Sequence, residues 1–412
     1  MNDTIHEDEK SLVAENEDLE KEDLYKLPDE VSEKEILESI KVEQKPTSED
    51  SKVLELKGKT EEEQAKELYV EFSTYLENKT DIKPDLGVKV TIPTGIDVFD
   101  AILGGGFAIG SLNIIVGQPG SGKTMLAIQA MGNGQRIYKG KLITAFLDSE
   151  EATTSIRLSN LGVRYPRITP YSDMTVEKVF KFIEGVCLFK QEKKLMDIPS
   201  VIIWDSIANT LSQKERETED INSVIGYKAR MLSILIPKYV AKCAKFNISL
   251  IAVNQLRDIL QIGQFTLPKE LKFMTTGKDM PGGNVLRFNA FQLVELKTKS
   301  VLLKEKYGFD GILVSAKTVK NKLFSPNVTV NLAGDFRTGF SNFWTSYQFL
   351  TETKRLQTGS WNLLVSLPDK KFRTKDALTL YNSDSKFKEF FDQEVQEAIK
   401  VDIIEKYNME VE

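Results

Sequence analysis

The fold of this chain is decided by the stretch Gly117-Gln118-Pro119-Gly120-Ser121-Gly122-Lys123-Thr124, which has the G-x-x-x-x-G-K-T pattern of a phosphate-binding P-loop. It follows the apolar run 112–116 and precedes an apolar segment, from Met125 to Ala130, that predicts a helix. In this context backbone N–H groups and a helix N-terminus converge on phosphate oxygens. We therefore expect residues 117–125 to bind a nucleoside triphosphate, with Lys123 at the β- and γ-phosphates and Thr124 on Mg²⁺.

Composition limits the other possibilities. The 412 residues are 41% hydrophobic, which suits one large domain with appendages or two domains. The sequence lacks a run of about 20 apolar residues and an apolar signal-peptide core, so we expect a cytoplasmic location without membrane contact. Cys187 and Cys243 lack metal-site spacing and are expected to be buried free thiols. The single histidine, His6, excludes histidine triads and leaves hydrolytic chemistry to carboxylates, lysines and Mg²⁺.

The formal net charge of −6 is unevenly distributed. Residues 1–50 contain 18 acidic and 6 basic side chains, whereas the remaining 362 residues contain 43 acidic and 49 basic ones. We expect residues 1–58 to form an acidic disordered tail, because they bury too little apolar surface to offset the entropy of ordering. Such a tail on a basic body could compete with a polyanionic partner or could serve only to keep the protein soluble.

From residue 89 onward, apolar segments alternate with helical patterns. We expect strands at 112–116, 142–147, 201–206 and 248–255, with helices at 153–161 and 176–189 and less regular strands at 285–296, 312–320 and 328–332. Continuous apolar strands of this kind indicate an α/β fold with a mostly parallel sheet that is covered on both faces. The expected nucleotide-hydrolysing core spans residues 89–338.

Two smaller segments flank this core. Thr60 and Glu63 have capping-box spacing and open an amphipathic helix that ends near Asn78, followed by a linker to residue 88. Its apolar stripe would pack either on the chain's own core or on a neighbouring subunit. Residues 339–412 surround the basic run 370–375 with aromatic side chains and are expected to form a small C-terminal α+β domain.

Candidate catalytic side chains follow the expected strands, where ligands of parallel sheets bind. Asp205 ends an apolar strand downstream of the P-loop, as a carboxylate that assists Thr124 in holding Mg²⁺ would. Glu150 ends another strand, and its position favours it over Glu151 for orienting the water that attacks the γ-phosphate. Gln255 could hydrogen-bond a γ-phosphate oxygen.

The long segment 256–283 opens directly after Gln255. It interleaves cationic and aromatic side chains that fit binding of single-stranded nucleic acid: Lys269, Lys272, Phe273 and Lys278. A second polar and charged loop is expected over residues 209–225. An unspecific lid over the nucleotide is the alternative for the longer segment.

Separated motifs over residues 90–325 together resemble a RecA-family recombinase of the bacterial RecA and phage UvsX branch. They are Ile92-Pro-Thr-Gly95, the P-loop, Phe146-Leu-Asp-Ser-Glu150, Asp205-Ser206, Gly226-Tyr-Lys-Ala-Arg230, Asn254-Gln-Leu-Arg257, Gly282-Gly-Asn284 and Val319-Lys320-Asn321-Lys322. The resemblance implies a RecA-type core that forms filaments on single-stranded DNA, binds ATP between subunits and pairs with homologous duplex DNA. It also implies an N-terminal oligomerisation helix, possible loading proteins and a bacterial or phage-infected cytoplasm.

The resemblance also implies residue roles. Glu150 would be the catalytic glutamate and Gln255 the switch that couples ATP to DNA, while Lys320 and Lys322 would reach the neighbouring subunit's γ-phosphate. The loops 209–225 and 256–283 would bind DNA, whose backbone would be contacted by Arg230, Gly282, Gly283 and Asn284. Arg157 stands where the family has a tyrosine on the adenine and could stack on the base. A hexameric helicase and a KaiC-like or RadB-like regulatory ATPase are the alternative functions.

Overall fold

The chain divides into two units, residues 1–86 and 87–412. The computed structural model describes residues 60, 63, 66–68, 70–72, 74–75, 89–164, 168–224, 226–258, 274–275 and 278–407. In the first unit the described residues from Glu63 to Tyr75 are helical, and the predicted capping box is present. The Glu63 N–H donates to Thr60 Oγ1 (3.3 Å), and the Thr60 N–H donates to Glu63 Oε2 (2.9 Å). The predicted tail 1–58 lies outside the described residues.

A mostly parallel sheet, nine-stranded over the described residues, forms the centre of the second unit, and the predicted α/β class is thereby confirmed. The order is β13-β12-β11-β10-β3-β7-β6-β4-β5, with β10 through β5 parallel and the other three antiparallel. The strands are β3 (Ser111–Gly117), β4 (Ile143–Asp148), β5 (Thr169–Tyr171), β6 (Ser200–Asp205), β7 (Ile248–Gln255), β10 (Gln292–Leu302), β11 (Gly311–Asn321), β12 (Thr329–Asp335) and β13 (Gly339–Phe340). A separate pair joins β1 (Thr91–Ile92) to β2 (Phe107–Ala108).

Side chains of the central strands alternate between two hydrophobic cores. On β3, Ile115 belongs to one core, whereas Ile114 and Val116 belong to the other. On β6, Ile203 and Trp204 divide in the same way, and all five side chains are fully buried. An apolar residue is therefore needed at every position, which explains why these strands read as continuous apolar runs.

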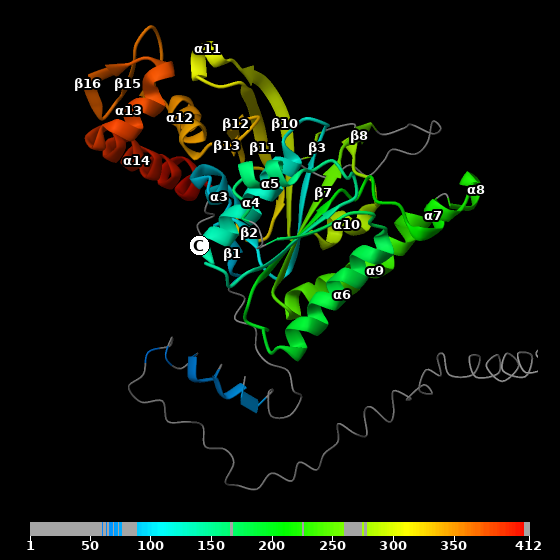
Figure 1. Cartoon of the computed structure of the whole chain (residues 1–412). Helices are drawn as coiled ribbons and strands as arrows, with labels where there is room; N and C mark the ends of the chain where they lie inside the picture. The colour runs from blue at the N-terminus through cyan, green and yellow to red at the C-terminus, as the bar shows by residue number, and fades with distance from the viewer. Residues whose placement is uncertain are drawn as a thin grey trace, which may run out of the picture. The chain divides into compact units, whose positions relative to one another are not determined.

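Helices cover both faces of the sheet (Figure 1). The core around Ile115 is completed by α3 (Asp97–Leu103) and α4 (Lys123–Ile137). On the other face α6 (Val176–Glu192) and α9 (Tyr227–Lys245) lie side by side. These two helices carry the buried free thiols Cys187 and Cys243, as predicted. Among the residues that the structure describes, no helix is both long and apolar enough to span a bilayer.

The residues after β13 are α+β, as predicted, but they share a hydrophobic core with the sheet. The Trp344 ring packs against the rings of Tyr307 (5.5 Å) and Phe309 (5.8 Å), which belong to the hairpin between β10 and β11. A domain boundary at residue 339 therefore stays a prediction. The elements are α12 (Asn342–Glu352), β14 (Leu356–Gln357), β15 (Asn362–Leu364), β16 (Leu367–Phe372), α13 (Ala377–Ser383) and α14 (Ser385–Ile399), followed by a π-helical turn (Lys400–Glu405).

Two predicted segments differ from the structure. The strand predicted over 285–296 begins only at Gln292, because the residues before it form α10 (Asn284–Asn289). This helix buries Leu286 in the core that includes α9. Short apolar runs do not by themselves distinguish a strand from a helix. The loop predicted over 209–225 contains α7 (Gln213–Glu217) and α8 (Ile221–Val224), and α7 begins with a capping box between Ser212 and Glu215.

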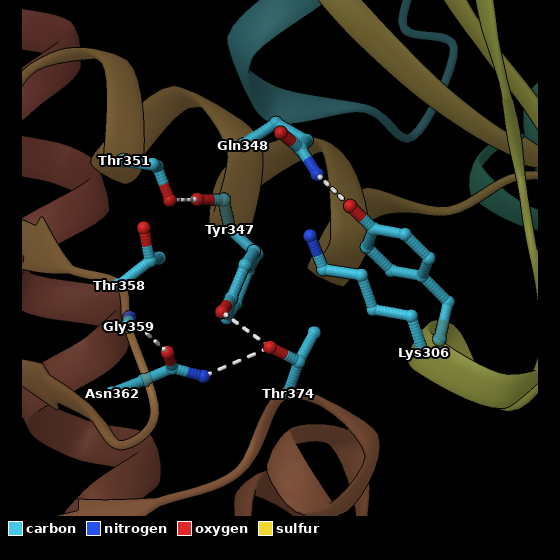
Figure 2. Close-up of a pocket in the computed structure, with 9 residues that line it drawn as sticks. Lys306, Tyr347, Gln348, Thr351, Thr358, Gly359, Asn362 and Thr374 are labelled. Carbon is cyan, nitrogen blue, oxygen red and sulfur yellow. Dashed lines mark hydrogen bonds between the residues drawn. The ribbon is translucent and has the colours of Figure 1, made fainter.

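A polar cleft of about 230 Å³ lies where α11 (Lys304–Tyr307) meets α12 and the C-terminal sheet (Figure 2). Asn362 Nδ2 donates to Thr374 Oγ1 (3.0 Å), and Gln348 Nε2 donates to the Tyr307 hydroxyl (3.4 Å). Because Leu296 pairs with Gly117 and α11 follows the end of β10, the cleft lies roughly 20 Å further along the strands than the P-loop. It is a separate feature of the C-terminal segment.

Glycine is required at position 106, where φ is 124° and an added Cβ would lie 2.4 Å from the Ile92 carbonyl oxygen. We expect Gly106→Ala to lower the free energy of unfolding by about 3 kcal/mol, through backbone strain and collision. Gly185 in α6 has open space around an added Cβ, so Gly185→Ala should raise the free energy of unfolding by up to about 1 kcal/mol. Urea unfolding curves measure both changes, and equal stability of the two variants would contradict this assignment.

Candidate functional site

Four adjacent strands bring the predicted residues to one edge of the sheet. β3 ends at Gly117 opposite Gln255 of β7, and Asp148 of β4 lies opposite Asp205 of β6. Because these strands are parallel, the P-loop and the loops that follow β4 and β6 all emerge at this carboxyl edge.

Space and backbone conformation both require glycine in the P-loop. A Cβ added to Gly117 would lie 2.5 Å from the Leu296 carbonyl oxygen. At Gly122, where φ is 83°, an added Cβ would lie 2.7 Å from the Phe340 ring. Phe340 is held in place by Gln129 of α4, whose amide accepts from the Phe340 N–H (2.8 Å) and donates to its carbonyl (2.7 Å). The edge strand β13 thus closes over the start of α4.

The P-loop also has the donors that a phosphate group requires. Ser121 Oγ is buried and has no hydrogen-bond partner among the described residues. Lys123 is 8% exposed, and its ammonium donates across the loop to the Gln118 carbonyl (2.8 Å). Burial lowers the pKa of Lys123. An unpaired hydroxyl, a buried ammonium and the N-terminus of the 15-residue helix α4 fit the binding of a phosphate group.

Thr124 and Asp205 form the part of the site that fits a divalent cation. The Thr124 hydroxyl donates to Asp205 Oδ2 (2.6 Å). Burial raises the pKa of Asp205 to about 7, and the Glu150 and Asp148 carboxylates act in the same direction. No group of three His, Cys, Asp or Glu side chains among the described residues could by itself hold a metal ion. Mg²⁺ would suit this oxygen-donor pair, since it is usually bound through one or two protein oxygens together with phosphates and water.

The turn after β4 is shaped by Asp148, for which the sequence predicts no separate role. Its Oδ1 accepts from the N–H groups of Glu150 and Glu151, both at 3.0 Å. Glu151, with φ of 52°, accepts from the N–H of Asp173 (3.0 Å), a residue that follows β5 on the side of β4 away from the P-loop strand β3. Glu150, rather than Glu151, therefore contacts the loop after β6, on the P-loop side of β4.

The loop after β6 contacts Glu150 directly. Glu150 Oε1 accepts from Ser206 Oγ (3.0 Å) and from Asn209 Nδ2 (2.6 Å). In the sequence, Ser206 belongs to a motif that assigns it no role, and Asn209 is only the start of a predicted loop. Polar residues directly after a strand end were the available signal.

Residues predicted to contact DNA gather at the start of α9. Gly282 has φ of 102°, and an added Cβ would lie 2.5 Å from Leu286. Gly283, with φ of 79°, approaches Ala229, so an added Cβ would lie 3.9 Å from the alanine methyl group. The next residue, Arg230, is exposed. The glycine pair and Arg230 therefore belong to one surface, on which Asn284 begins α10.

This surface is tied to the end of β7. Asn254 Nδ2 donates to the Pro281 carbonyl (2.8 Å), directly before Gly282, and Asn254 Oδ1 accepts from the Gln255 N–H (3.0 Å). Lys278 lies in β9 (Lys278–Asp279), which pairs with β8 (Arg257–Asp258) to form the base of the long segment. The predicted contacts Lys269, Lys272 and Phe273 lie outside the described residues.

Lys320 and Lys322 are not brought to the P-loop of their own chain. Lys320 pairs with Leu293 of β10, which pairs with Ile114 of β3, about 10 Å before Gly117 along the strand. Lys320 thus lies near the end of β11, beside the amino end of β10, and neither lysine is at the P-loop edge. The Lys320 ammonium donates to the last carbonyls of α10, those of Arg287 (3.0 Å) and Phe288 (2.8 Å), and the Lys322 ammonium lies 5.6 Å from the Phe291 ring centroid.

Two further predicted nucleotide contacts have partners within the chain. Met125 is buried in the first turn of α4. Arg157 lies in α5 (Ser155–Asn160), which is capped by the Thr154 hydroxyl, and its guanidinium donates to the carbonyls of Phe336 and Arg337. A role for Arg157 on the base stays a prediction, and it would require the guanidinium to leave these carbonyls or to stack while bound to them.

The pairing of Thr124 with Asp205 predicts how Mg²⁺ affects nucleotide affinity. We expect Asp205→Asn to weaken binding of a fluorescent ATP analogue about tenfold or more when Mg²⁺ is present, because a charged partner is lost at a buried site. With Mg²⁺ chelated, the variant and the wild type should bind alike. Asp197→Asn, at an exposed carboxylate before β6, is the matched control. If Mg²⁺ raises the affinity of Asp205→Asn for the analogue as much as it raises that of the wild type, the assignment of Asp205 to the cation is wrong.

Comparison with known proteins agrees with this geometry. Residues 79–341 match the family described as RecA N-terminal domain. The chain is 31% identical to Protein RecA of Thermus aquaticus over 244 residues, which are 59% of this chain and 66% of the relative. It is 33% identical to Protein RecA of Desulforapulum autotrophicum over 236 residues, 57% of this chain and 62% of that relative. The chain thus spans just under two thirds of the length of these relatives. With the P-loop edge described above, the match over residues 79–341 shows that this chain belongs to the RecA family.

Proposed function

We propose that the chain is an ATP-dependent DNA recombinase, which polymerises on single-stranded DNA and pairs that strand with homologous duplex DNA. ATP and Mg²⁺ would bind at the P-loop, where the cation would supply charge stabilisation for phosphoryl transfer. Lys123 would hold the phosphates, Glu150 would orient the attacking water, and Gln255 would sense the γ-phosphate. Hydrolysis would release the DNA.

The observation that carries this proposal is the position of Lys320 and Lys322. Lys320 lies about 10 Å from Gly117 along the strands, away from the P-loop edge, so we infer that the two lysines act on the nucleotide site of a neighbouring subunit. A cation supplied by another subunit makes hydrolysis depend on assembly. Because the P-loop and these lysines lie in different parts of the chain, such a contact would be head-to-tail and would generate a filament or a ring.

The surface proposed for DNA is connected to the same lysines. α10 begins at the Gly282–Gly283 turn, and its last carbonyls bind the Lys320 ammonium. Arg230 and Lys278 add positive charge beside this turn, and phosphate contacts of this kind position a nucleic-acid strand without reading its sequence. Binding of DNA at one end of α10 can therefore affect the trans lysine at its other end.

The helix of the first unit supports self-association. Leu68, Phe72 and Tyr75 are 69%, 57% and 60% exposed. An amphipathic helix stabilises itself chiefly by burying its apolar face against another surface. We propose that this helix docks on an adjoining subunit and so links successive members of the filament.

Electron microscopy tests the proposal most directly. With a non-hydrolysable ATP analogue, Mg²⁺ and single-stranded DNA, we expect helical filaments that do not form when nucleotide is omitted. Closed six-membered rings would instead support a helicase. A monomer that does not bind DNA under these conditions would favour a regulatory ATPase. A strand-exchange assay with homologous and heterologous duplexes then separates recombination from mere filament formation.

Mixed filaments test the trans site. Lys123→Ala and Lys320→Ala should each abolish DNA-stimulated hydrolysis, but a 1:1 mixture should recover activity, because about one interface in four then combines an intact P-loop with an intact lysine. Mixing either variant with the Lys123→Ala/Lys320→Ala double variant gives no such interface and is the control. No recovery in the first mixture would count against a lysine supplied in trans.

A further inference from the structure

The carboxylate proposed to orient the attacking water is restrained by the protein itself. Glu150 Oε1 accepts hydrogen bonds from Asn209 Nδ2 (2.6 Å) and Ser206 Oγ (3.0 Å). The backbone of Glu150 is fixed as well, since its N–H donates to Asp148 (3.0 Å). Rotation of the Glu150 side chain away from this loop has to break these side-chain contacts, so the two donors limit the orientations that the carboxylate can take.

Asn209 is positioned by carbonyl contacts on either side of it. The Lys228 ammonium, from the first turn of α9, donates to the carbonyls of Ala208 (3.1 Å) and Thr210 (2.7 Å). The Thr210 hydroxyl donates to the Ser206 carbonyl (2.7 Å), which closes the turn. Burial lowers the pKa of Lys228 to about 8.

The same turn continues into the surface proposed for DNA. Asn209 is exposed and is the first residue of the segment 209–225, while Arg230 lies two residues beyond Lys228 on the same helical turn. A shift of this segment or of the first turn of α9 would move the carbonyls that Lys228 holds. The Asn209 amide would then withdraw from Glu150.

We propose that Asn209 is a positioning residue that restrains Glu150 until DNA engages the 209–225 segment, and that Lys228 sets the turn from which it acts. This inference rests on the proposed function for the identity of the activating ligand. The restraint itself depends only on the contacts of Glu150. One hydrogen bond to a charged group corresponds to roughly tenfold or more in an equilibrium constant, which is enough to control the fraction of Glu150 that is free to act.

The test measures ATP hydrolysis by the full chain with and without single-stranded DNA. In Asn209→Ala we expect the DNA-free rate to rise about tenfold, with less than about threefold change in the DNA-saturated rate, so that the stimulation ratio falls. Asn382→Ala, at an exposed asparagine of α13, is the matched control and should leave both rates unchanged. A stimulation ratio that does not change, or a parallel fall of both rates, would overturn the restraint.

Double variants show whether the effect passes through Glu150. Asn209→Ala combined with Glu150→Gln should lose the gain in DNA-free hydrolysis, since the freed group is then absent. Lys228→Met, which keeps the aliphatic stem, should reproduce the Asn209→Ala effect, and the two substitutions together should be non-additive. Additive effects, or a gain that survives Glu150→Gln, would refute the inference. Circular dichroism melting curves show whether Lys228→Met is misfolded. If it is, the test rests on Asn209→Ala alone, because an exposed residue can be replaced without disturbing the fold.

The DNA-free measurement also separates this inference from the proposed function. If Asn209→Ala raises hydrolysis but DNA does not stimulate the wild type, the restraint holds and the proposed activating ligand is wrong. If DNA stimulates hydrolysis equally in the wild type and in Asn209→Ala, and the DNA-free rate of the variant is unchanged, the recombinase proposal holds and the restraint is wrong.

Discussion

The register of the parallel strands β3, β7, β6 and β4 is the constraint on which the rest of the structure depends. It aligns Gly117 with Gln255 and Asp148 with Asp205, so that groups from four loops meet at one edge. Packing maintains this register, because alternate side chains of each strand fill two different cores. The site is therefore positioned by buried elements, and only its outer loops are left to respond to ligands.

Two hydrogen-bonded routes lead from this edge to the surface proposed for DNA. One passes from Glu150 through Asn209 to Lys228 at the start of α9. The other passes from Gln255 through Asn254 to the Pro281 carbonyl, next to the glycine turn. Both routes are series of single hydrogen bonds between polar groups. Such contacts can be broken and remade at modest cost, which suits a coupling between two ligands.

The antiparallel side of the sheet contributes differently. β13 places Phe340 over Gly122 and is bound through Gln129 to α4, so the segment before α12 supports the nucleotide edge. β11 carries Lys320 away from this edge, to the end of α10. In the proposed assembly, one chain contributes the P-loop edge together with the cations that would complete a neighbour's nucleotide site. This separation is the physical basis for proposing that activity requires assembly.

The sequence by itself determined the P-loop, the capping box at Thr60, the two buried thiols and β7, predicted with its observed bounds over 248–255. These features depend on neighbouring residues or on an apolar run whose burial needs no knowledge of its partner. Only the tertiary structure decided that 284–289 is helical, that Asn209 binds Glu150, and that Lys320 binds the end of α10 rather than its own P-loop. Those outcomes depend on strand order and on contacts between segments far apart in the chain, and local pattern carries no information about which distant groups will meet.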